Sequence, residues 1–204
     1  MNPVSVLAAY PDRAPLGTPK RVRGDMKPDS TVVRVTAMTT ATAPTIDDVS
    51  ALGTALSLVA PPEFEDGNGH VNVGRYYRLH MQAADAAFTE LGFDDDYRAR
   101  TGHSVFSVEH HIRFHDESLV GDELSVHLRL LGVAPKAIHG LTIIVNRSRG
   151  TIANTLEFIE LHVDLTSRRT TPMPEDLTAG LRERLREHEA LTWSLPLAAT
   201  MGVR

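Results

Sequence analysis

A carboxylate, a side-chain amide and an imidazole lie within five residues of one another in one short segment. They belong to Asp66, Asn68 and His70, and two glycines, Gly67 and Gly69, alternate with them. Glycine allows positive φ angles, so we expect a tight turn here. A helical pattern begins directly afterwards, which places the turn at a helix N-terminus whose free N–H groups favour negative charge. Such a turn can polarise a carbonyl oxygen while Asp66 acts as a base or a nucleophile.

Each of the three polar residues also has a structural interpretation. Asp66 can hold the loop together as an Asx-turn residue. Asn68 can orient water or a carboxylate, or it can simply be a turn former. His70 can carry a proton or contribute only its backbone N–H, and we favour the backbone role. The residue types alone do not decide between these interpretations.

One long amphipathic helix is expected to hold the turn in place. Apolar residues recur at three- and four-residue steps from Val73 to Leu91, the spacing of a helix with one buried face. Asn72 is a suitable N-cap, and Gly92 follows the last periodic position, where a glycine commonly ends a helix. The predicted buried stripe consists of Val73, Tyr77, Met81, Ala84, Phe88 and Leu91.

Strand patterns flank this helix on both sides. A first strand is expected near 54–60, and Pro61 and Pro62 should keep the chain after it extended and out of a helix. The sequence between Asp94 and Gly102 is polar and is expected to be a connection. Four further strands follow, at 104–114, 122–131, 137–146 and 151–165.

The strand at 104–114 carries a second candidate carboxylate, Glu109. Simple alternation places Ser107, Glu109, His111 and Arg113 on one face. The same alternation places Phe106, Val108, His110, Ile112 and Phe114 on the other. Glu109 can be a surface charge paired with Arg113. Alternatively, its face forms an interface in which the carboxylate is buried.

The order of elements predicts an α+β fold. Consecutive strands joined by short turns imply an antiparallel sheet. One sheet curled around a single long helix buries both elements in the simplest way. Because such a sheet keeps open edges, we expect protomers to pair.

Composition divides the 204-residue chain into three parts. Residues 1–45 contain six prolines, many threonines and six basic against three acidic residues, so we expect a disordered extension. Residues 46–176 should form the folded domain. Residues 177–204 are expected to be a C-terminal helix and tail, with the charged helix spanning about Glu175 to Leu191 as a solvated cap or an interaction helix.

Charge and composition exclude several classes of function. A net charge of −5 argues against nucleic acid as a partner, and no apolar run is long enough to span a membrane. The absence of cysteine excludes thiolate metal sites. His110, His111 and His115 cluster in sequence, but alternation separates the first two, so no metal is expected. Without an apolar leader segment, we expect a cytoplasmic protein.

Four motifs occur in an order that resembles a known family. The turn has the form Asp–x–Asn–Gly–His–x–Asn, and VEHHIRF, GDEL and LHVDLTSRRTTPMP follow it. Over about residues 54–176 the chain resembles hotdog-fold acyl-CoA thioesterases of the 4-hydroxybenzoyl-CoA thioesterase type. Within that group it is most similar to the betainyl-CoA thioesterase module associated with L-carnitine dehydrogenase. The resemblance implies a hotdog fold, with a five- or six-stranded antiparallel sheet wrapped around one long helix.

The resemblance also implies roles for individual residues. Asp66 would be the catalytic carboxylate, with Asn68 and His70 beside it, and Glu109 would be a second active-site carboxylate. Backbone N–H groups at Gly69, His70 and their neighbours would bind the thioester oxygen. No metal or other cofactor is implied, and the family forms dimers or tetramers with sites at subunit interfaces. The expected substrate contacts are Gly69, Asn72, Tyr76 and Tyr77.

The expected activity is hydrolysis of a small acyl-CoA thioester to a free acid and coenzyme A. The acyl group can be betainyl or aromatic, and Tyr76, Tyr77 and Trp193 are candidates for a cage around a quaternary ammonium. Two alternatives remain at this point. One is a hotdog enoyl-CoA hydratase or dehydratase, and the other is a non-catalytic protein that binds acyl-CoA.

Overall fold

The computed structural model describes residues 42–203, so the prediction for residues 1–41 lies outside the described part of the chain. The helices are α1 (Ile46–Ser50), α2 (Val73–Glu90), α3 (Asp95–Thr101) and α4 (Glu175–Glu189), with a 3-10 turn, η1, at Pro62–Phe64. The strands are β1 (Leu56–Val59), β2 (His103–Phe114), β3 (Glu123–Ala134), β4 (Ala137–Asn146), β5 (Thr151–Asp164) and β6 (Arg169–Thr170).

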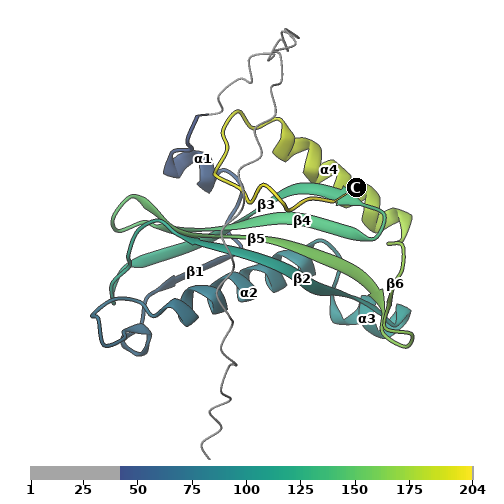
Figure 1. The fold of residues 1–204 in the computed structure, drawn as a ribbon, viewed down its shortest axis with the longest axis horizontal. Helices are drawn as coiled ribbons and strands as arrows, with labels where there is room; N and C mark the ends of the chain where they lie inside the picture. Colours follow the sequence, from purple (N-terminus) through teal and green to yellow (C-terminus); the bar gives the residue numbers. More distant parts are fainter. Residues whose placement is uncertain (1–41, 204) are drawn as a thin grey trace, which may run out of the picture. The chain divides into compact units, whose positions relative to one another are not determined.

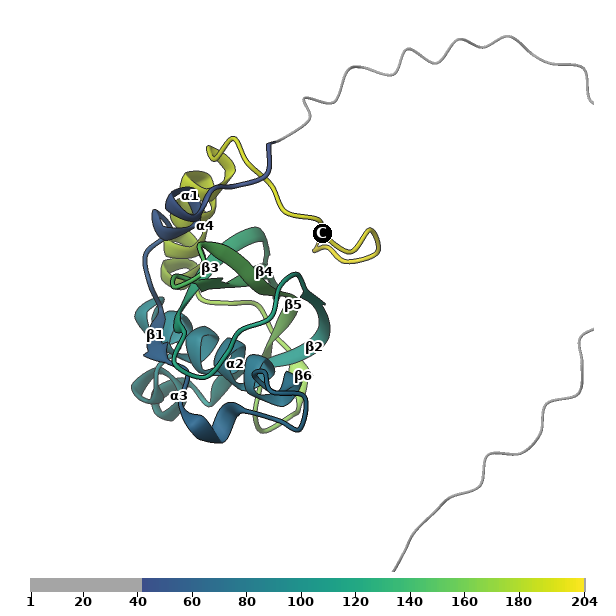
Figure 2. The ribbon, with the colours of Figure 1, turned by 90° about the vertical axis from the view of Figure 1, so that its left-hand side faces the viewer.

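The sheet is antiparallel and wraps around α2. Its strands run in the order β1-β3-β4-β5-β2, and the short β6 pairs with β5. Figure 1 shows α2 lying against one face of the curled sheet, while α1 and α4 lie on the opposite side. The turned view in Figure 2 separates the same layers. The predicted α+β hotdog fold is therefore confirmed, with β1 and β2 at the two ends of the strand order.

The ends of α2 follow the sequence prediction closely. The Asn72 side chain accepts the N–H of Gly74, as an N-cap does. The helix ends at Glu90, and Gly92 just beyond it has a φ of +95°, which glycine adopts without strain.

The buried face of α2 differs from the predicted stripe. Val73 and Tyr77 are 58% and 44% exposed. They face outward because the helix packs against the sheet through a neighbouring row of residues. That row includes the imidazole of His80, which a search for apolar residues passes over. The buried row consists of Tyr76, Leu79, His80, Ala83 and Ala87, with Phe88 shared between the two stripes. Met81, Ala84 and Leu91 of the predicted stripe are partly buried against the same apolar cluster as Phe88.

A β-bulge in β2 overturns the simple alternation predicted for that strand. Ser107 lies opposite Glu160 and Glu109 lies opposite Ile159, so Val108 is one residue in excess of the pairing. Val105 and Ile112 consequently lie on the same face and pack against the apolar cluster that contains Phe88 of α2. Phe106 therefore points to the other face and does not share a face with Ile112 and Phe114.

Several short elements were not predicted. The polar segment after Asp94 forms α3, capped by the Asp94 side chain and ended by Gly102 with a φ of +67°. The segment after Pro61 is a 3-10 turn rather than an extended run, because proline is well suited to the first position of a helical turn. The helix α1 begins with a capping box between Thr45 and Asp48, and Thr42 ahead of it forms an isolated bridge with Trp193.

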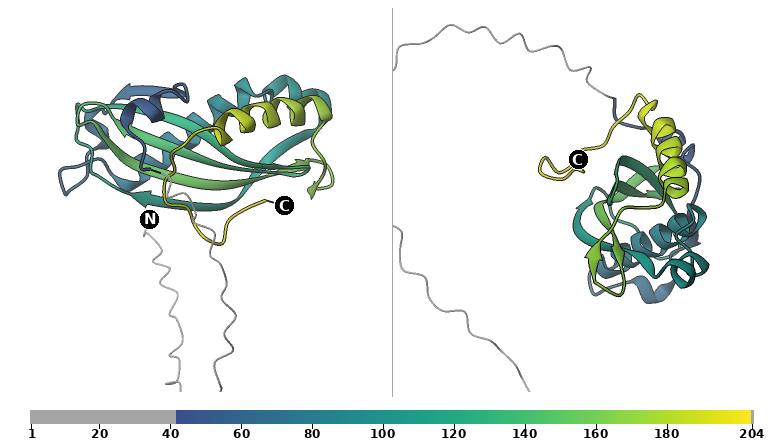
Figure 3. Two further views of the ribbon diagram at one scale, coloured as in Figure 1. Left: turned by 90° about the horizontal axis from the view of Figure 1, so that it is seen from above. Right: turned by 90° about the vertical axis from the view of Figure 1, so that its right-hand side faces the viewer.

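The C-terminal helix is part of the folded unit. The described residues, 42–203, belong to one compact unit, and Leu181 of α4 is buried in the apolar cluster that contains Phe88 and Phe158. Seen from above in Figure 3, α1 and α4 lie over the strands. The boundary expected at 176 falls inside the first turn of α4. None of the described helices has the length and apolar character needed to cross a membrane.

Candidate functional site

The segment from Glu65 to Val71 is a compact turn closed by its own backbone. Glu65 and Val71 form an isolated antiparallel bridge, and the N–H of Asp66 donates to the carbonyl of His70 at 3.0 Å. The N–H of Gly69 donates back to the carbonyl of Asp66 at 3.0 Å, with a Gly69 φ of +81°. The glycine is needed here because this backbone conformation is strained for other residues. The predicted tight turn is confirmed.

The carboxylate of Asp66 is held by its neighbours. Its Oδ1 accepts the N–H of Asn68 at 2.9 Å, which is an Asx-turn contact, and its Oδ2 accepts the side-chain amide of Asn72 at 3.4 Å. Nδ1 of His70 lies 3.6 Å from Oδ1, and the Asp66 side chain is 18% exposed. The side chain thus has the structural role considered above, and its fixed position also suits a catalytic group.

His70 is oriented by a hydrogen bond of its own. Nδ1 lies 3.2 Å from the carbonyl of Val71 and also faces Asp66. Two oxygen acceptors at Nδ1 favour the tautomer that carries its proton there, which leaves Nε2 as an acceptor. Asp66 and His70 are therefore brought together.

The backbone donors at the helix start differ from the expected set. The N–H of Gly69 is used inside the turn, and that of Gly74 binds the Asn72 side chain. Within residues 42–203, the N–H groups of His70 and Val73 donate no hydrogen bond to the protein. His70 and Val73 are thus the N–H groups at this helix start that are free to meet a substrate oxygen.

A pocket of about 370 Å³ lies beside the start of α2. We call it the Tyr76 pocket, and it is lined by His70, Val71, Val73, Tyr76 and residues 114–117. Tyr76 packs edge-on against Phe114 with ring centroids 5.8 Å apart. Asp66 is not itself a lining residue, but His70, which contacts it, is.

Of the two tyrosines predicted to bind substrate, only Tyr76 lines this pocket. Tyr77 points to β2 instead, where its hydroxyl is hydrogen-bonded to Nδ1 of His110 at 3.1 Å. Burial raises the pKa of the Tyr76 hydroxyl, Ser118 opposes the rise, and the negative charge of Asp116 adds to it. The hydroxyl makes no hydrogen bond of good geometry within the described residues, although Ser118 is its polar neighbour.

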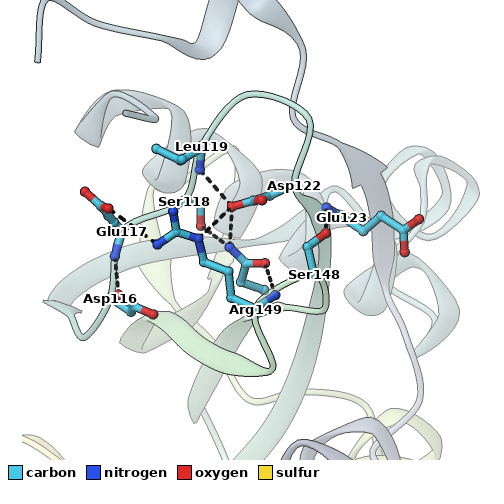
Figure 4. Close-up of polar contacts among 9 residues, drawn as sticks. Asp116, Glu117, Ser118, Leu119, Asp122, Glu123, Ser148 and Arg149 are labelled. Atoms are coloured by element: carbon cyan, nitrogen blue, oxygen red, sulfur yellow. Dashed lines mark hydrogen bonds and ion pairs between the residues drawn. The ribbon is translucent and has the colours of Figure 1, made fainter. Parts of the chain in front are cut away.

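The loop between β2 and β3 supports both the turn and the pocket, and Figure 4 shows the polar contacts that hold this loop together. The carbonyl of Ser118 accepts the N–H of Val71 at 2.8 Å, which ties the turn to this loop. Asp122 closes the loop by accepting the N–H of Leu119 and the amide of Asn146, with Arg149 at 3.4 Å. Burial favours the neutral acid, but these hydrogen bonds and Arg149 together hold the pKa of Asp122 below its usual value. The anchored loop fixes one wall of the pocket.

Glu109 is not brought to Asp66 within one chain. It is exposed and lies opposite Ile159, on the sheet face away from α2, and no hydrogen bond or ion pair joins it to Asp66 or Arg113 in the described part of the chain. A different acid, Glu160, faces α2 instead. It is 7% exposed, accepts the hydroxyl of Ser107 at 2.6 Å and lies 4.0 Å from Nε2 of His110.

Sequence reasoning missed Glu160 and Asp116. Glu160 lies in β5 between Ile159 and Leu161, whose apolar side chains occupy the opposite face. This alternation could have indicated that Glu160 points to the other face of the sheet. Asp116 lies in the loop two residues after the end of β2, where no periodicity marks it.

Two further predictions concern residues outside the pocket. Trp193 is buried on the α4 side of the sheet with Arg129 over its ring at 4.2 Å, so its predicted place in a substrate cage is wrong. In residues 42–203 there is no group of three or more His, Asp or Glu side chains placed to hold a metal ion.

Comparisons with known proteins agree on one family. The chain matches the Thioesterase-like superfamily over residues 60–181. It is 39% identical over 139 residues to an L-carnitine dehydrogenase/betainyl-CoA thioesterase of Agrobacterium fabrum, covering 68% of this chain and 28% of that protein. It is 31% identical over 130 residues to a betainyl-CoA thioesterase of Pseudomonas aeruginosa, covering 64% and 82%. The chain thus spans about a quarter of the length of the two-function relatives.

Solved structures share the fold at low sequence identity. A hypothetical protein of Staphylococcus aureus in complex with CoA matches with a TM-score of 0.66 and 20% identity, covering 73% of this chain and 94% of that one. A 1,4-dihydroxy-2-naphthoyl-CoA thioesterase of Synechocystis matches with a TM-score of 0.56 and 15% identity, covering 63% and 94%. With the family match extending over more than half of its length, the chain belongs to the Thioesterase-like superfamily.

Proposed function

We propose that this protein hydrolyses an acyl-CoA thioester to a free acid and coenzyme A. The observation that carries the proposal is the fixed carboxylate of Asp66 at the N-terminus of α2, next to His70 on the rim of the Tyr76 pocket. A carboxylate, free backbone N–H groups and a pocket are the components that thioester cleavage needs. Family membership and the named thioesterase relatives support the same reaction class.

The reaction follows from the arrangement of these groups. The thioester oxygen would accept the N–H groups of His70 and Val73, whose donor capacity the helix dipole of α2 reinforces. As a general base, Asp66 would take a proton from the water that attacks the carbonyl carbon. As a nucleophile, it would form a mixed anhydride that water then opens. In both routes the C–S bond breaks and the thiolate of coenzyme A leaves and takes up a proton.

We expect Asp66→Asn to lower kcat/KM by at least about 100-fold, because the amide can neither accept a proton nor attack. The measurement follows release of coenzyme A with a thiol reagent over a panel of short, aromatic and betainyl esters. Asp85→Asn, an exposed residue on α2, makes the same chemical change away from the turn and should remain within about twofold. A folded Asp66→Asn protein with full activity would end the proposal, and hydration of enoyl-CoA without thioester cleavage would favour a hydratase.

We also propose that the active protein is a homo-oligomer. Within residues 42–203, the edge strand β2 pairs with a strand on one side only, and Val108 and Phe114 are 54% and 51% exposed. An exposed edge with apolar side chains favours pairing with a second copy. Glu109 does not reach Asp66 of its own chain. If a second copy binds at this edge, Glu109 would lie beside the active site of that copy.

A further inference from the structure

The strand β3 is only partly covered along its outer edge. In the described part of the chain, β1 begins at Leu56 opposite Val126, so no strand lies beside β3 beyond that point. The carbonyl of Val126 accepts the N–H of Ala55 at 2.9 Å. Further along the same edge, the N–H of Leu130 donates to Nδ1 of His188 at 2.8 Å. A side chain of α4 thus takes the place of a neighbouring strand at Leu130.

Leu128 lies between these two positions, and its backbone groups face the same edge. Along an antiparallel strand, the backbone groups of alternate residues point to the same side. The N–H and carbonyl of Leu128 are therefore directed to the gap between the start of β1 and α4. Within residues 42–203 neither group is hydrogen-bonded at this edge, and Leu128 is only partly buried. One donor and one acceptor are thus available side by side.

A pocket of about 130 Å³ opens onto this part of β3. We call it the edge pocket, and it is lined by residues 52–55, the last turn of α2, Leu128, Arg184 and His188. The helices α2 and α4 lie on opposite faces of the sheet (Figure 1), and both reach the pocket because no strand separates them here. A cavity of similar size holds benzene, so this pocket has room for about six heavy atoms.

The α4 side of the edge pocket offers hydrogen-bond donors. Burial lowers the pKa of His188 to about 4, with Arg184 and Arg129 adding to the shift, so the ring is neutral at pH 7. Because Nδ1 accepts the Leu130 N–H, the proton lies on Nε2. His188 is 6% exposed, and this second N–H has no partner among the described residues. Arg184 bonds Glu187 through Nε at 3.2 Å, which leaves its terminal nitrogens to meet an acceptor.

The α2 side of the edge pocket is negative. Glu90 is the last residue of α2 and lines the pocket, and the ion pairs of α4 join residues within that helix and do not reach Glu90. The C-terminal end of a helix carries the negative end of its dipole, so a positive group is favoured here. Leu52, Ala87 and Leu91 add a small apolar surface. The edge pocket therefore has donors on one side and negative charge on the other.

We propose that the edge pocket binds a small free α-amino acid. Its carboxylate would accept the N–H of Leu128 and lie toward Arg184 and His188. Its ammonium would donate to the carbonyl of Leu128 and lie toward Glu90. An α-amino acid carries these groups at the spacing of the N–H and carbonyl of a strand residue, so it would continue the ladder where β1 stops.

Size and charge narrow the class of ligand. A zwitterion matches both sides of the edge pocket, whereas a simple carboxylate or amine leaves one charge without a counterpart. With room for about six heavy atoms, the side chain is limited to about a methyl or hydroxymethyl group. The site lies at the other end of α2 from Asp66, so the proposal goes beyond the proposed hydrolysis and does not depend on it.

Calorimetry with L-alanine and three related probes tests the proposal. Propionate lacks the ammonium group, ethylamine lacks the carboxylate, and L-tryptophan keeps both groups but is too large. We expect L-alanine to bind with a Kd in the low millimolar range and the other three to bind at least about tenfold more weakly. No detectable binding of L-alanine, or equal affinity for L-alanine, propionate and ethylamine, would overturn the proposal.

Two exposed residues allow the site to be located by substitution. Glu90→Gln and Arg184→Gln each remove one charge from the edge pocket, so each should weaken L-alanine binding by roughly fivefold or more. Asp85→Asn and Arg186→Gln are matched controls, because they are exposed on the same two helices outside the pocket. The controls should remain within about twofold. Unchanged binding in both pocket variants would contradict the edge pocket.

A competition measurement separates this site from the Tyr76 pocket. In a thioesterase assay, L-alanine should leave KM for the ester unchanged, because the two pockets lie at opposite ends of α2. Competition with the ester that persists in Arg184→Gln would place L-alanine in the Tyr76 pocket and overturn the proposal. The calorimetry requires no turnover, so a protein that cleaves no thioester but binds L-alanine would sink only the proposed hydrolysis.

Discussion

The side chains around Asp66 are fixed by local contacts. The carboxylate takes one N–H from Asn68 and the amide of Asn72, and His70 is oriented by the carbonyl of Val71. Such preorganisation reduces the rearrangement required when charge develops on a substrate oxygen. It also explains why the turn has both a structural and a chemical interpretation, since the same hydrogen bonds serve both.

The role of His70 can be tested through its side chain. If His70 contributes its backbone N–H, His70→Ala should lower kcat by less than about tenfold, because alanine retains the donor. The pH dependence of kcat should keep its shape, since no titrating catalytic group has been removed. A loss as large as that of Asp66→Asn, together with a changed pH profile, would assign proton transfer to the imidazole instead.

At the scale of elements, the close packing of β4 against β5 depends on Gly140. A Cβ at this position would lie 2.3 Å from Cζ of Phe158, a large ring with 1% exposure in the core beneath the sheet. The ring fits because the neighbouring strand has no side chain there.

Gly140→Ala should therefore reduce the free energy of unfolding by about 1–3 kcal/mol, measured by urea denaturation. Gly180→Ala is a matched control in α4, since a Cβ there meets nothing within 4 Å and the residue is exposed. The control should raise stability by about 0.5–1 kcal/mol, because alanine favours a helix over glycine. Equal effects of the two substitutions would show that the Phe158 contact does not limit packing.

Elements governed by neighbouring residues were predictable from the sequence. The cap at Asn72, the stop near Gly92 and the four long strands all follow from local patterns. The bulge at Val108 was not predictable, because it is defined by pairing with a strand some fifty residues later. The short helix α3 was missed since its polar residues bury little apart from Tyr97.

The same limit applies to the candidate site. Asp66, Asn68 and His70 are close in sequence, so their proximity was predictable. Asp116 meets Tyr76 only through the tertiary fold, and His80 was overlooked because an imidazole does not register in an apolar stripe. Contacts of that kind require the packed sheet and helix.

At the scale of the whole molecule, two buried histidines link stability to pH. His80 lies between α2 and the sheet, where it donates to Asn154 at 2.6 Å and accepts from Thr142 at 2.8 Å. Burial lowers the pKa of His80 to about 4, although the hydrogen bond to Asn154 acts to raise it. His188 accepts the N–H of Leu130, and burial with Arg184 and Arg129 lowers its pKa to about 4.

We expect stability to fall as pH decreases from about 6.5 to 4. In this window the unfolded chain binds protons at both histidines and the folded chain does not, so protons favour unfolding. His80 alone should account for at most about 3 kcal/mol. Urea denaturation at pH 7 and pH 4.5 measures the loss, and His80→Gln should reduce it. An unchanged pH dependence in a folded His80→Gln protein would contradict this assignment.

Self-association should respond to the exposed edge. Val108→Glu places a charge on β2 without removing a buried contact, so it should shift the protein toward monomers in light scattering coupled to gel filtration. Val59→Glu on the opposite edge strand, with a similar exposure of 57%, is the matched control. A wild-type protein that is monomeric at micromolar concentration would contradict the oligomer.

The bulge at Val108 has a consequence for how this chain tolerates change in length. Because Ser107 and Glu109 already occupy successive rungs opposite Glu160 and Ile159, Val108 is a spare residue in the ladder. Excising it would leave every other residue of β2 on its present side of the sheet. Deleting Ile112 would instead shift the register by one residue. Either Phe114 or the residues before position 112 would then point to the other face of the sheet, and the contact between Phe114 and Tyr76 would be lost.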